Sequence, residues 1–386
     1  MVFKTDLLYT ALGKPIKNGM IRTDQEGKIL EVGANLSVEN SEVNYLEGAL
    51  CPGFINTHCH LELSHLKNKI ESGKGLISFI KGVQSQRKAE EEEIQEAILK
   101  ADEEMWKAGI VAVGDISNGT TSFLQKQKSN IEYHTFVELF GFDPAKATEV
   151  WTRGQKVQAT AIAMGLSASL VPHSPYSVSK PLFQLLKAEK DNAPICIHNQ
   201  ENEAENELYQ NGTGAFRKML ESFGLPLEHI KGMQQNSLPA YLPLLPDSKP
   251  LLLVHNTFSN QADITSAKNL HKQLYWCLCP RANQYIENRL ANVPLFMQEN
   301  LKCTLGTDSL ASNYGLSILE EMKCIQAHFP EIELEQLIEW GCKNGADFLG
   351  KNQLGSFEAG KKPGINWLKN IQADRRIGDV EVEKVL

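Results

Sequence analysis

The sequence alternates short apolar runs with longer segments of helical periodicity, and this rhythm begins near residue 51. Each apolar run has the length of a buried strand. The runs span residues 53–56, 110–116, 133–140, 166–171, 194–198, 251–255, 274–278 and 303–306. Eight such strands alternating with helices over roughly 300 residues favour an α/β fold of the (β/α)8 TIM barrel type over an open sheet.

The segments between the apolar runs predict helices. In residues 88–108 apolar side chains recur every three or four positions, and Gly109 is placed to end the helix. Further helices are expected at residues 181–189, 203–222, 260–272, 317–328 and 333–349.

The two ends of the chain differ in character from the middle. Residues 1–50 predict short strands, with a turn at 24–27 and a strand at 28–33. From about residue 351 the chain turns polar and ends in strand-like pieces that can pair with the N-terminal strands. We therefore expect residues 51–350 to build the barrel and residues 1–50 and 351–386 to build one small second domain.

Length and charge narrow the class of protein. The 386 residues suffice for one barrel of about 250 residues and an accessory piece. The net charge of −8 argues against nucleic acid or an anionic membrane as the main partner, because no basic excess neutralises phosphates. No apolar stretch approaches the ~20 residues of a membrane span or forms a signal-peptide core. With cysteines mostly in apolar runs, we expect a cytoplasmic protein with reduced thiols.

Polar residues gather where the predicted strands end. Five of the ten histidines occupy such positions. In a barrel the active site lies at the carboxyl ends of the strands, so these side chains are expected to converge. The strand-end residues are His58, His60, His173, His198, Glu201, His255 and Asp308.

Four of these residues predict a metal site. His58 and His60 are two positions apart, so both imidazoles point to the same side of an extended strand. With His198 and Asp308 the set becomes three imidazoles and one carboxylate. This donor set suits one divalent ion, with Zn²⁺ expected and Fe²⁺ or Mn²⁺ as alternatives.

Three strand-end residues are suited to activating a water molecule and transferring protons. A bound divalent ion lowers the pKa of water and supplies a hydroxide nucleophile. Asp308 can bind the metal and also take the proton from the water. Glu201, one helical turn beyond His198, fits a proton shuttle to the substrate or its leaving group. His255 is expected to hold the hydroxide or polarise the bond under attack; the alternative is a hydrogen-bonded core histidine.

Six short motifs surround these residues. They are Pro-Gly-Phe-Ile-Asn-Thr-His-Cys-His at 52–60, Val-Pro-His-Ser-Pro-Tyr-Ser at 171–177, His-Asn-Gln-Glu at 198–201, Leu-Val-His at 253–255, Cys-Pro-Arg-Ala-Asn at 279–283 and Leu-Gly-Thr-Asp-Ser at 305–309. Together, and in this order, they resemble the chlorohydrolase/aminohydrolase (ATZ/TRZ-like) branch of the amidohydrolase superfamily. This branch includes guanine, cytosine, adenosylhomocysteine and aminofutalosine deaminases.

The resemblance implies a mononuclear metal site. Superfamily members with two metals bridge them by a carboxylated lysine after strand four, where this chain has Leu-Val-Pro-His at 170–173. His173 is then expected to contact the substrate. The resemblance also implies that the chain ends form a small composite β-sandwich. The family's Gly-Lys-x-Ala-Asp run reads Gly-Lys-Lys-Pro-Gly at 360–364, a departure that bears on the strand pairing there.

The implied activity is that of a metal-dependent aminohydrolase, a hydrolase of C–N bonds other than peptide bonds. Ammonia would leave a heterocycle, most specifically a purine nucleoside or base such as aminofutalosine, adenosylhomocysteine, methylthioadenosine or guanine. The loop at 60–64 and the segment at 75–79 are similar to aminofutalosine deaminases. Glu62 is expected to meet a purine ring nitrogen or amidine edge, and Arg281 a substrate carboxylate. The alternatives are a solvent-facing carboxylate and a structural ion pair.

Two other functions remain open from the sequence. The same residues can hydrolyse a C–Cl or amide bond, because the leaving group depends on pocket contacts. A noncatalytic metal-binding scaffold is the alternative from another class, although the ligands and both proton-transfer candidates are present. The expected partner is a small heterocyclic molecule. The sequence defines no oligomeric state and is compatible with a homodimer.

Overall fold

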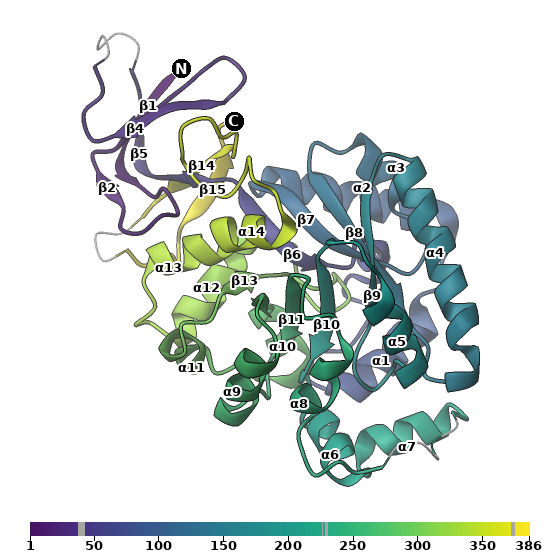
Figure 1. Cartoon of the computed structure of the whole chain (residues 1–386). Coiled ribbons are helices and arrows are strands. Elements are labelled where there is room, and N and C mark those ends of the chain that lie inside the picture. The colour runs from purple at the N-terminus through teal and green to yellow at the C-terminus, as the bar shows by residue number, and fades with distance from the viewer. Residues whose placement is uncertain (38–42, 226, 228–230, 372–374) are drawn as a thin grey trace.

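The computed structural model describes residues 1–37, 43–225, 227, 231–371 and 375–386, and it has an α/β organisation (Figure 1). Its centre consists of two four-stranded parallel sheets, in the orders β6-β7-β8-β9 and β10-β11-β12-β13. The strands are β6 (Phe54–Cys59), β7 (Ile110–Ser117), β8 (Glu132–Leu139), β9 (Ser167–Pro172), β10 (Ile195–Asn199), β11 (Leu251–His255), β12 (Leu274–Leu278) and β13 (Cys303–Leu305). Each of the predicted runs overlaps one of them, because a strand buried on both faces needs a continuous apolar run.

The two central sheets meet at both of their outer edges. At one edge the backbone N–H of His198, in β10, donates to the carbonyl oxygen of His173, which follows β9, at 2.9 Å. At the other edge the N–H groups of Thr307 and Asp308, after β13, donate to the carbonyl oxygen of His58, in β6, at 3.0 and 3.1 Å. These hydrogen bonds bring the carboxyl ends of strands from both sheets together.

Helices connect the strands. They are α1 (Leu76–Gln86), α2 (Glu91–Lys107), α3 (Phe123–Lys128), α4 (Ala147–Ala163), α5 (Lys180–Ala188), α6 (Glu203–Asn211), α7 (Ala215–Ser222), α8 (Ser237–Tyr241), α9 (Gln261–Leu270), α10 (Pro280–Glu287), α11 (Val293–Gln298), α12 (Ile318–His328), α13 (Leu334–Ile338) and α14 (Gly345–Leu349), with a π-helical turn at Glu339–Asn344 between the last two. The helix predicted at 88–108 is confirmed as α2, and those predicted at 181–189, 260–272 and 317–328 as α5, α9 and α12.

The helix predicted over 333–349 is confirmed as α13, the π-helical turn and α14, whereas α1, α3, α4, α8, α10 and α11 were not predicted. Two of the differences have a clear physical reason. The helix predicted over 203–222 is divided into α6 and α7, because Gly212 and Gly214 adopt φ values of 70° and 99° that a helix cannot contain. Helix α4 was not among the predicted helices, since its buried face includes the small residues Ala147, Gly154 and Ala161. A Cβ atom at Gly154 would lie 2.3 Å from the Leu139 side chain, so the close packing of α4 on β8 depends on this glycine.

The two ends of the chain form one seven-stranded sheet. It has the order β15-β14-β5-β1-β3-β4, and β2 pairs with β1. The strands are β1 (Val2–Leu8), β2 (Ile16–Lys17), β3 (Met20–Thr23), β4 (Ile29–Gly33), β5 (Val43–Pro52), β14 (Ile365–Lys369) and β15 (Glu381–Lys384). The predicted pairing of the two ends is confirmed, because β14 runs antiparallel to β5 with Ile365 opposite Pro52. The divergent Pro363-Gly364 pair leads directly into β14, and Pro363 accepts a hydrogen bond from the N–H of Gly53 at 3.1 Å.

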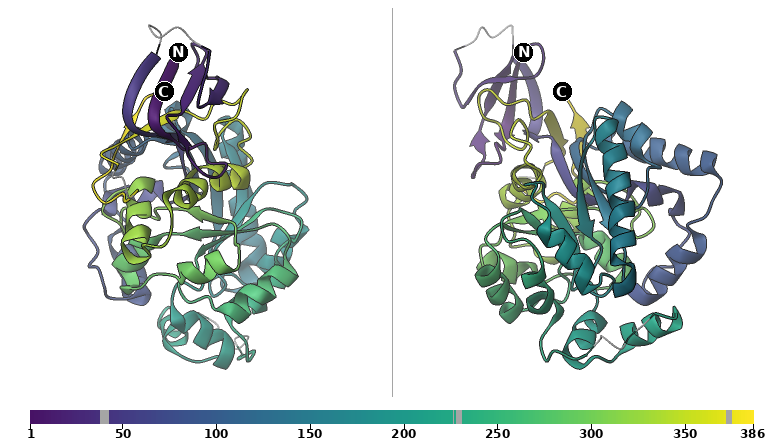
Figure 2. Two further views of the ribbon diagram at one scale, coloured as in Figure 1. Left: turned by 90° about the vertical axis from the view of Figure 1, so that its left-hand side faces the viewer. Right: turned by 45° about the vertical axis from the view of Figure 1, so that its right-hand side comes forward.

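The terminal sheet lies at one end of the molecule, and α6 and α7 lie at the other (Figures 1 and 2). The main hydrophobic core joins both central sheets to the surrounding helices. A separate apolar cluster joins α1, α6, α7 and α10. Within the described residues, no helix combines the length and apolar character required to cross a membrane.

Candidate active site

Four of the predicted residues converge at the carboxyl ends of the central strands. One donor atom from each of His58, His60, His198 and Asp308 lies within 4.8 Å of the other three. The Nε2 atoms of His58 and His60 are 3.2 Å apart, and Asp308 Oδ1 lies 3.5 Å and 3.3 Å from them. All four side chains are buried. Nitrogen and oxygen donors at these separations can share one metal ion.

A buried ion pair supports the backbone beside the two histidines. His58 lies in β6 and His60 follows it. The N–H of the next residue, Leu61, donates to Asp115 Oδ1 at 2.7 Å. Asp115 Oδ2 in turn lies 2.6 Å from the Nζ atom of Lys126, and both side chains are inaccessible to solvent. The ion pair therefore restrains the chain where it leaves the metal-binding strand.

His198 has one ring nitrogen committed and the other free for a metal. Its Nδ1–H donates to the backbone carbonyl oxygen of His173 at 2.8 Å. This bond selects the tautomer whose Nε2 lone pair is available. The same carbonyl accepts the backbone N–H of His198, so the ring orientation follows from the joining of β9 and β10.

The electrostatics of the cluster suit a cation. Burial lowers the pKa of His58 to about 4 and the pKa values of His60 and His198 to about 3, which keeps the imidazoles neutral. Burial alone would raise the pKa of Asp308, but its hydrogen bond with His58 and the nearby histidines hold that pKa well below the ordinary value. Ser312 Oγ donates to Asp308 Oδ2 at 2.5 Å, which leaves Oδ1 facing the histidines. Neutral imidazoles and an ionised carboxylate are the protonation states that metal binding needs.

Glu201 and His255 stand beside the cluster as a pair. Glu201 Oε1 lies 3.7 Å from His255 Nε2, and both side chains are buried. Burial raises the pKa of Glu201 well above its ordinary value, with the charge of Asp308 adding to the effect. His255 Nδ1–H donates to Asn283 Oδ1 at 2.9 Å, and its Nε2 has no hydrogen-bond partner among the described residues. The pair therefore offers a carboxylic acid and a free imidazole nitrogen.

The backbone is strained where these side chains leave the strands. His255 has a φ of 73° and Asp308 a φ of 56°, in the left-handed region that side chains other than glycine seldom adopt. Gln200, next to Glu201, has a φ of 44°. Such strain concentrates at functional sites, because it persists only where the surrounding structure enforces it.

A cavity of about 930 Å³ lies beside the ligand cluster and the pair of Glu201 and His255. The polar part of its wall includes His60, His173, His198, Glu201, His255 and Asp308. Aromatic and aliphatic residues line much of the rest of its wall, among them Phe79, Phe140, Phe142, Val150, Met219 and Phe223, and charged side chains such as Arg87, Lys146 and Arg153 also line it. A cavity of this size and character is typical of small-molecule sites.

The predicted substrate-contacting residues occupy different places. His173 lines the cavity, with its ring 4.0 Å from that of Phe140. Glu62 is buried and is not among the lining residues; its Oε2 accepts the N–H of Asn118 at 3.1 Å. Arg281 is not a lining residue either: its guanidinium lies over the Tyr314 ring at 6.0 Å. The structure thus brings His173 to the cavity, holds Glu62 behind its wall through Asn118, and places Arg281 outside the lining residues.

Glu138 is a cavity residue that the sequence analysis did not identify. It lies in β8, lines the cavity, and has one donor atom within 4.8 Å of those of His173 and His198. Burial raises its pKa to about 8. The sequence signal for Glu138 was a lone carboxylate near the end of an apolar run. Burying such a group costs free energy, so its presence in a buried strand indicates a functional role.

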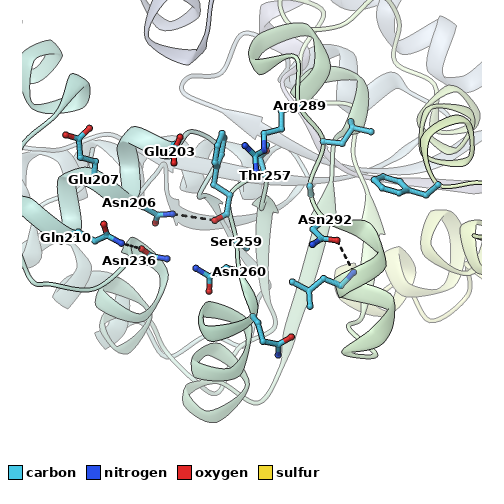
Figure 3. Close-up of a pocket in the computed structure, with 16 residues that line it drawn as sticks. Glu203, Asn206, Glu207, Gln210, Asn236, Thr257, Ser259, Asn260, Arg289 and Asn292 are labelled. Carbon is cyan, nitrogen blue, oxygen red and sulfur yellow. Dashed lines mark hydrogen bonds between the residues drawn. The ribbon is translucent and has the colours of Figure 1, made fainter.

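A second pocket, of about 1090 Å³, contains none of the predicted site residues (Figure 3). Two of its amides serve as helix caps: Asn260 caps α9 and Asn292 caps α11. Two others, Gln210 and Asn236, bond to each other at 2.6 Å. Because these polar groups are already used within the fold, we assign the chemistry to the first cavity.

The parallel strands, with this donor set at their carboxyl ends, define a class of hydrolases. The profile of the amidohydrolase family matches residues 49–381, and the chain belongs to this family.

Two related sequences and one solved structure are similar to this chain over most of its length. The adenosine deaminase of Helicobacter pylori is 27% identical over 353 residues, which cover 88% of this chain and 84% of that protein. The aminodeoxyfutalosine deaminase of Nitratiruptor sp. is 26% identical over 330 residues, with 82% and 77% covered. The structure of H. pylori aminofutalosine deaminase in complex with methylthio-coformycin has a TM-score of 0.80 at 23% identity, over 95% of this chain and 91% of that one.

Proposed function

We propose that this protein is a zinc-dependent deaminase. It would hydrolyse the C–N bond that joins the amino group to the adenine ring of a nucleoside and release ammonia. The observation that carries the proposal is the convergence of His58, His60, His198 and Asp308 next to the buried Glu201. The relatives that act on adenine nucleosides support the choice of ring.

The donor set fits one divalent ion. Three neutral imidazoles and one ionised carboxylate suit Zn²⁺, and Fe²⁺ or Mn²⁺ would accept the same ligands. When bound, such an ion lowers the pKa of a water molecule so that the water becomes a nucleophile near neutral pH.

Asp308 and Glu201 then transfer the protons, and His255 orients the attacking water. Asp308 accepts a proton from the attacking water, since its carboxylate stays ionised. Glu201 keeps its own proton until the substrate arrives and donates it to the ring nitrogen next to the reacting carbon. His255 orients the water through its free Nε2. Glu201 then takes the remaining proton of the added hydroxyl group and passes it to the amino group, so that ammonia can leave. The proton held by Asp308 returns to Glu201, which restores both carboxyl groups.

The cavity supports a substrate larger than a free base. Its volume of about 930 Å³ is near the upper end for small-molecule sites, and the apolar wall extends well beyond the histidines. We propose that the base lies against His173 and the ligand cluster while the rest of the nucleoside occupies the apolar part. Glu62 would support this wall from behind through Asn118, a lining residue.

We also propose the architecture expected from the sequence. The hydrogen bonds at both sheet edges support a closed (β/α)8 barrel over residues 51–350. The pairing of β14 with β5 supports a composite β-sandwich domain of residues 1–50 and 351–386.

The test is ammonia release by the zinc-loaded protein from a substrate panel. The panel holds adenosine, methylthioadenosine, adenosylhomocysteine, aminofutalosine, guanine, cytosine and a pterin. We expect turnover with adenine nucleosides and none with guanine or cytosine. If the zinc-bound protein released no ammonia from any compound of the panel, the proposed deaminase activity would be rejected, and hydrolysis of another bond would be favoured.

A further inference from the structure

Glu201 follows a strained residue of the backbone. It lies in the short connection between β10 and α6, directly after Gln200. Gln200 has a φ of 44°, in the left-handed region that a glutamine seldom adopts. Such a conformation costs free energy and persists only where neighbouring groups enforce it. The direction in which the Glu201 side chain leaves the backbone therefore depends on what holds Gln200.

Every polar group of Gln200 is bonded inside the protein. Its side-chain amide bonds at 2.5, 2.9 and 3.0 Å to three buried side chains, those of Ser259, Asn206 and Asp263. Its carbonyl oxygen accepts the N–H of Phe258 at 2.9 Å. Its backbone N–H donates to Glu205 Oε1 at 3.0 Å. This N–H belongs to the peptide plane before Gln200 and the carbonyl to the plane after it, so the two backbone bonds together fix the strained φ.

The bond from Glu205 differs from an ordinary helix cap. Glu205 is the third residue of α6, and Asn202 caps that helix. A glutamate at this position commonly accepts the backbone N–H of the capping residue, which completes a capping box. Here the carboxyl group instead accepts the N–H of Gln200, two residues further back. The bond therefore supports the turn that carries Glu201 and not the first turn of the helix.

The Glu205 carboxyl group is itself held in place. It is only 1% exposed, and Ser237 Oγ donates to the same Oε1 atom at 2.5 Å. Burial raises its pKa to about 8, with the charge of Glu201 adding to the effect, so burial favours the neutral form. Burying an acidic side chain costs free energy, and this cost is explained if the carboxyl group serves the reaction through its neighbours.

We propose that Glu205 is a positioning residue of the deaminase: by accepting the N–H of Gln200 it fixes the turn that directs Glu201 towards His255. This inference rests on the proposed function, in which Glu201 transfers the protons, and adds to it the group that holds Glu201 in place.

Three variants separate the hydrogen bond from the carboxyl group. Glu205→Gln keeps an acceptor at the same reach, Glu205→Asp keeps the carboxyl group but shortens the reach by one methylene group, and Glu205→Leu removes the acceptor. We expect kcat for adenosine to fall about 10- to 100-fold in the Asp and Leu variants, since misplacing a catalytic group by about 1 Å costs about 100-fold. In Glu205→Gln, kcat should stay within about threefold of wild type, because the acceptor is kept. KM should change less than about threefold in all three, because the bond acts on proton transfer and not on binding.

A second background tests whether Glu205 acts through Glu201. In Glu201→Gln the proton to be placed is absent, so adding Glu205→Leu should lower kcat by less than about threefold. Glu207→Leu is the matched control, because Glu207 lies on the same helix but is exposed, and it should keep the wild-type kcat. Zinc content and circular dichroism of each variant show whether the metal and the fold are retained.

The outcomes separate the two proposals. A wild-type kcat in Glu205→Leu, a Glu205→Gln variant as slow as Glu205→Leu, or equal losses in both backgrounds would overturn the positioning role while the deaminase stands. If Glu205→Leu does not fold, Glu205→Asp takes its place and the same outcomes decide. A wild-type protein that releases no ammonia from any nucleoside would overturn the proposed function and this inference with it.

Discussion

The Oε1 atom of Glu201 lies 3.7 Å from the Nε2 atom of His255, and both side chains are buried. Burial pushes the two groups towards neutrality in opposite ways: it raises the pKa of Glu201 and lowers the pKa of His255. Burial therefore favours the protonated form of the carboxyl group and the unprotonated form of the imidazole. An acid and a base separated in this way by their environment can serve one reaction in two roles.

The first prediction concerns the proton of Glu201. Glu201→Gln keeps the shape of the side chain and removes its ability to transfer a proton. We expect kcat to fall at least 100-fold, the lower range for general acid–base catalysis, with the zinc content unchanged. Steady-state ammonia release and elemental analysis of the same sample measure both quantities. Turnover near that of wild type would remove Glu201 from the mechanism.

The second prediction concerns the metal. Asp308→Asn keeps a residue that tolerates the φ of 56° but weakens the carboxylate ligand. Loss of an outer partner alone lowers metal affinity 10- to 100-fold, so loss of this ligand should lower zinc affinity by more than about 100-fold. Competition with a chromophoric chelator measures the affinity. Asp143→Asn, in the same cavity wall, is the control and should bind zinc like wild type.

The third prediction concerns the buried pair of Asp115 and Lys126. Lys126→Met leaves the carboxylate buried without its countercharge, which should lower the free energy of unfolding by about 3–5 kcal/mol. The double variant Asp115→Asn/Lys126→Met removes both charges and keeps an acceptor for Leu61. We expect it to be more stable than the single variant in urea titrations. A double variant that is less stable than the single one would contradict the argument.

The fourth prediction concerns pH. Burial raises the pKa of Glu321 from 4.5 to about 8, so the unfolded chain releases this proton at lower pH than the folded protein. The stabilising contribution is present below pH 4.5 and is lost as pH rises towards 8. Relative to Glu321→Gln, the free energy of unfolding of wild type should fall by about 1.4 kcal/mol per pH unit in this window. Urea titrations at pH 5 and 7.5 test it, and a difference independent of pH would contradict it.

The sequence predicted the central strands well because their physics is local. A strand covered on both faces must be apolar throughout, and a run such as 251–255 shows this without reference to the rest of the chain. Helix α4 was missed because its packing depends on Gly154 lying against Leu139, a contact that no periodicity reveals. The joining of the two sheets through His198 and His173 is likewise a long-range backbone contact.

The site was predictable where a residue type is unusual for its position. Histidines at strand ends, such as His58 and His198, stand out against apolar neighbours, and the structure brings them together. Glu138 lies inside the run 133–140, whose apolar character predicts strand core, so the pattern does not distinguish it. Arg281 was expected at the cavity because it follows a strand, but it lies in the first turn of α10, and its guanidinium lies over Tyr314.

The most direct test of the account is a zinc titration of the metal-free protein, with bound zinc and ammonia release from adenosine followed in the same samples. We expect that activity is absent without metal, rises in proportion to bound zinc and saturates at one ion per chain. Activity that persists in the metal-free protein, or that does not follow the occupancy of a single site, would contradict it.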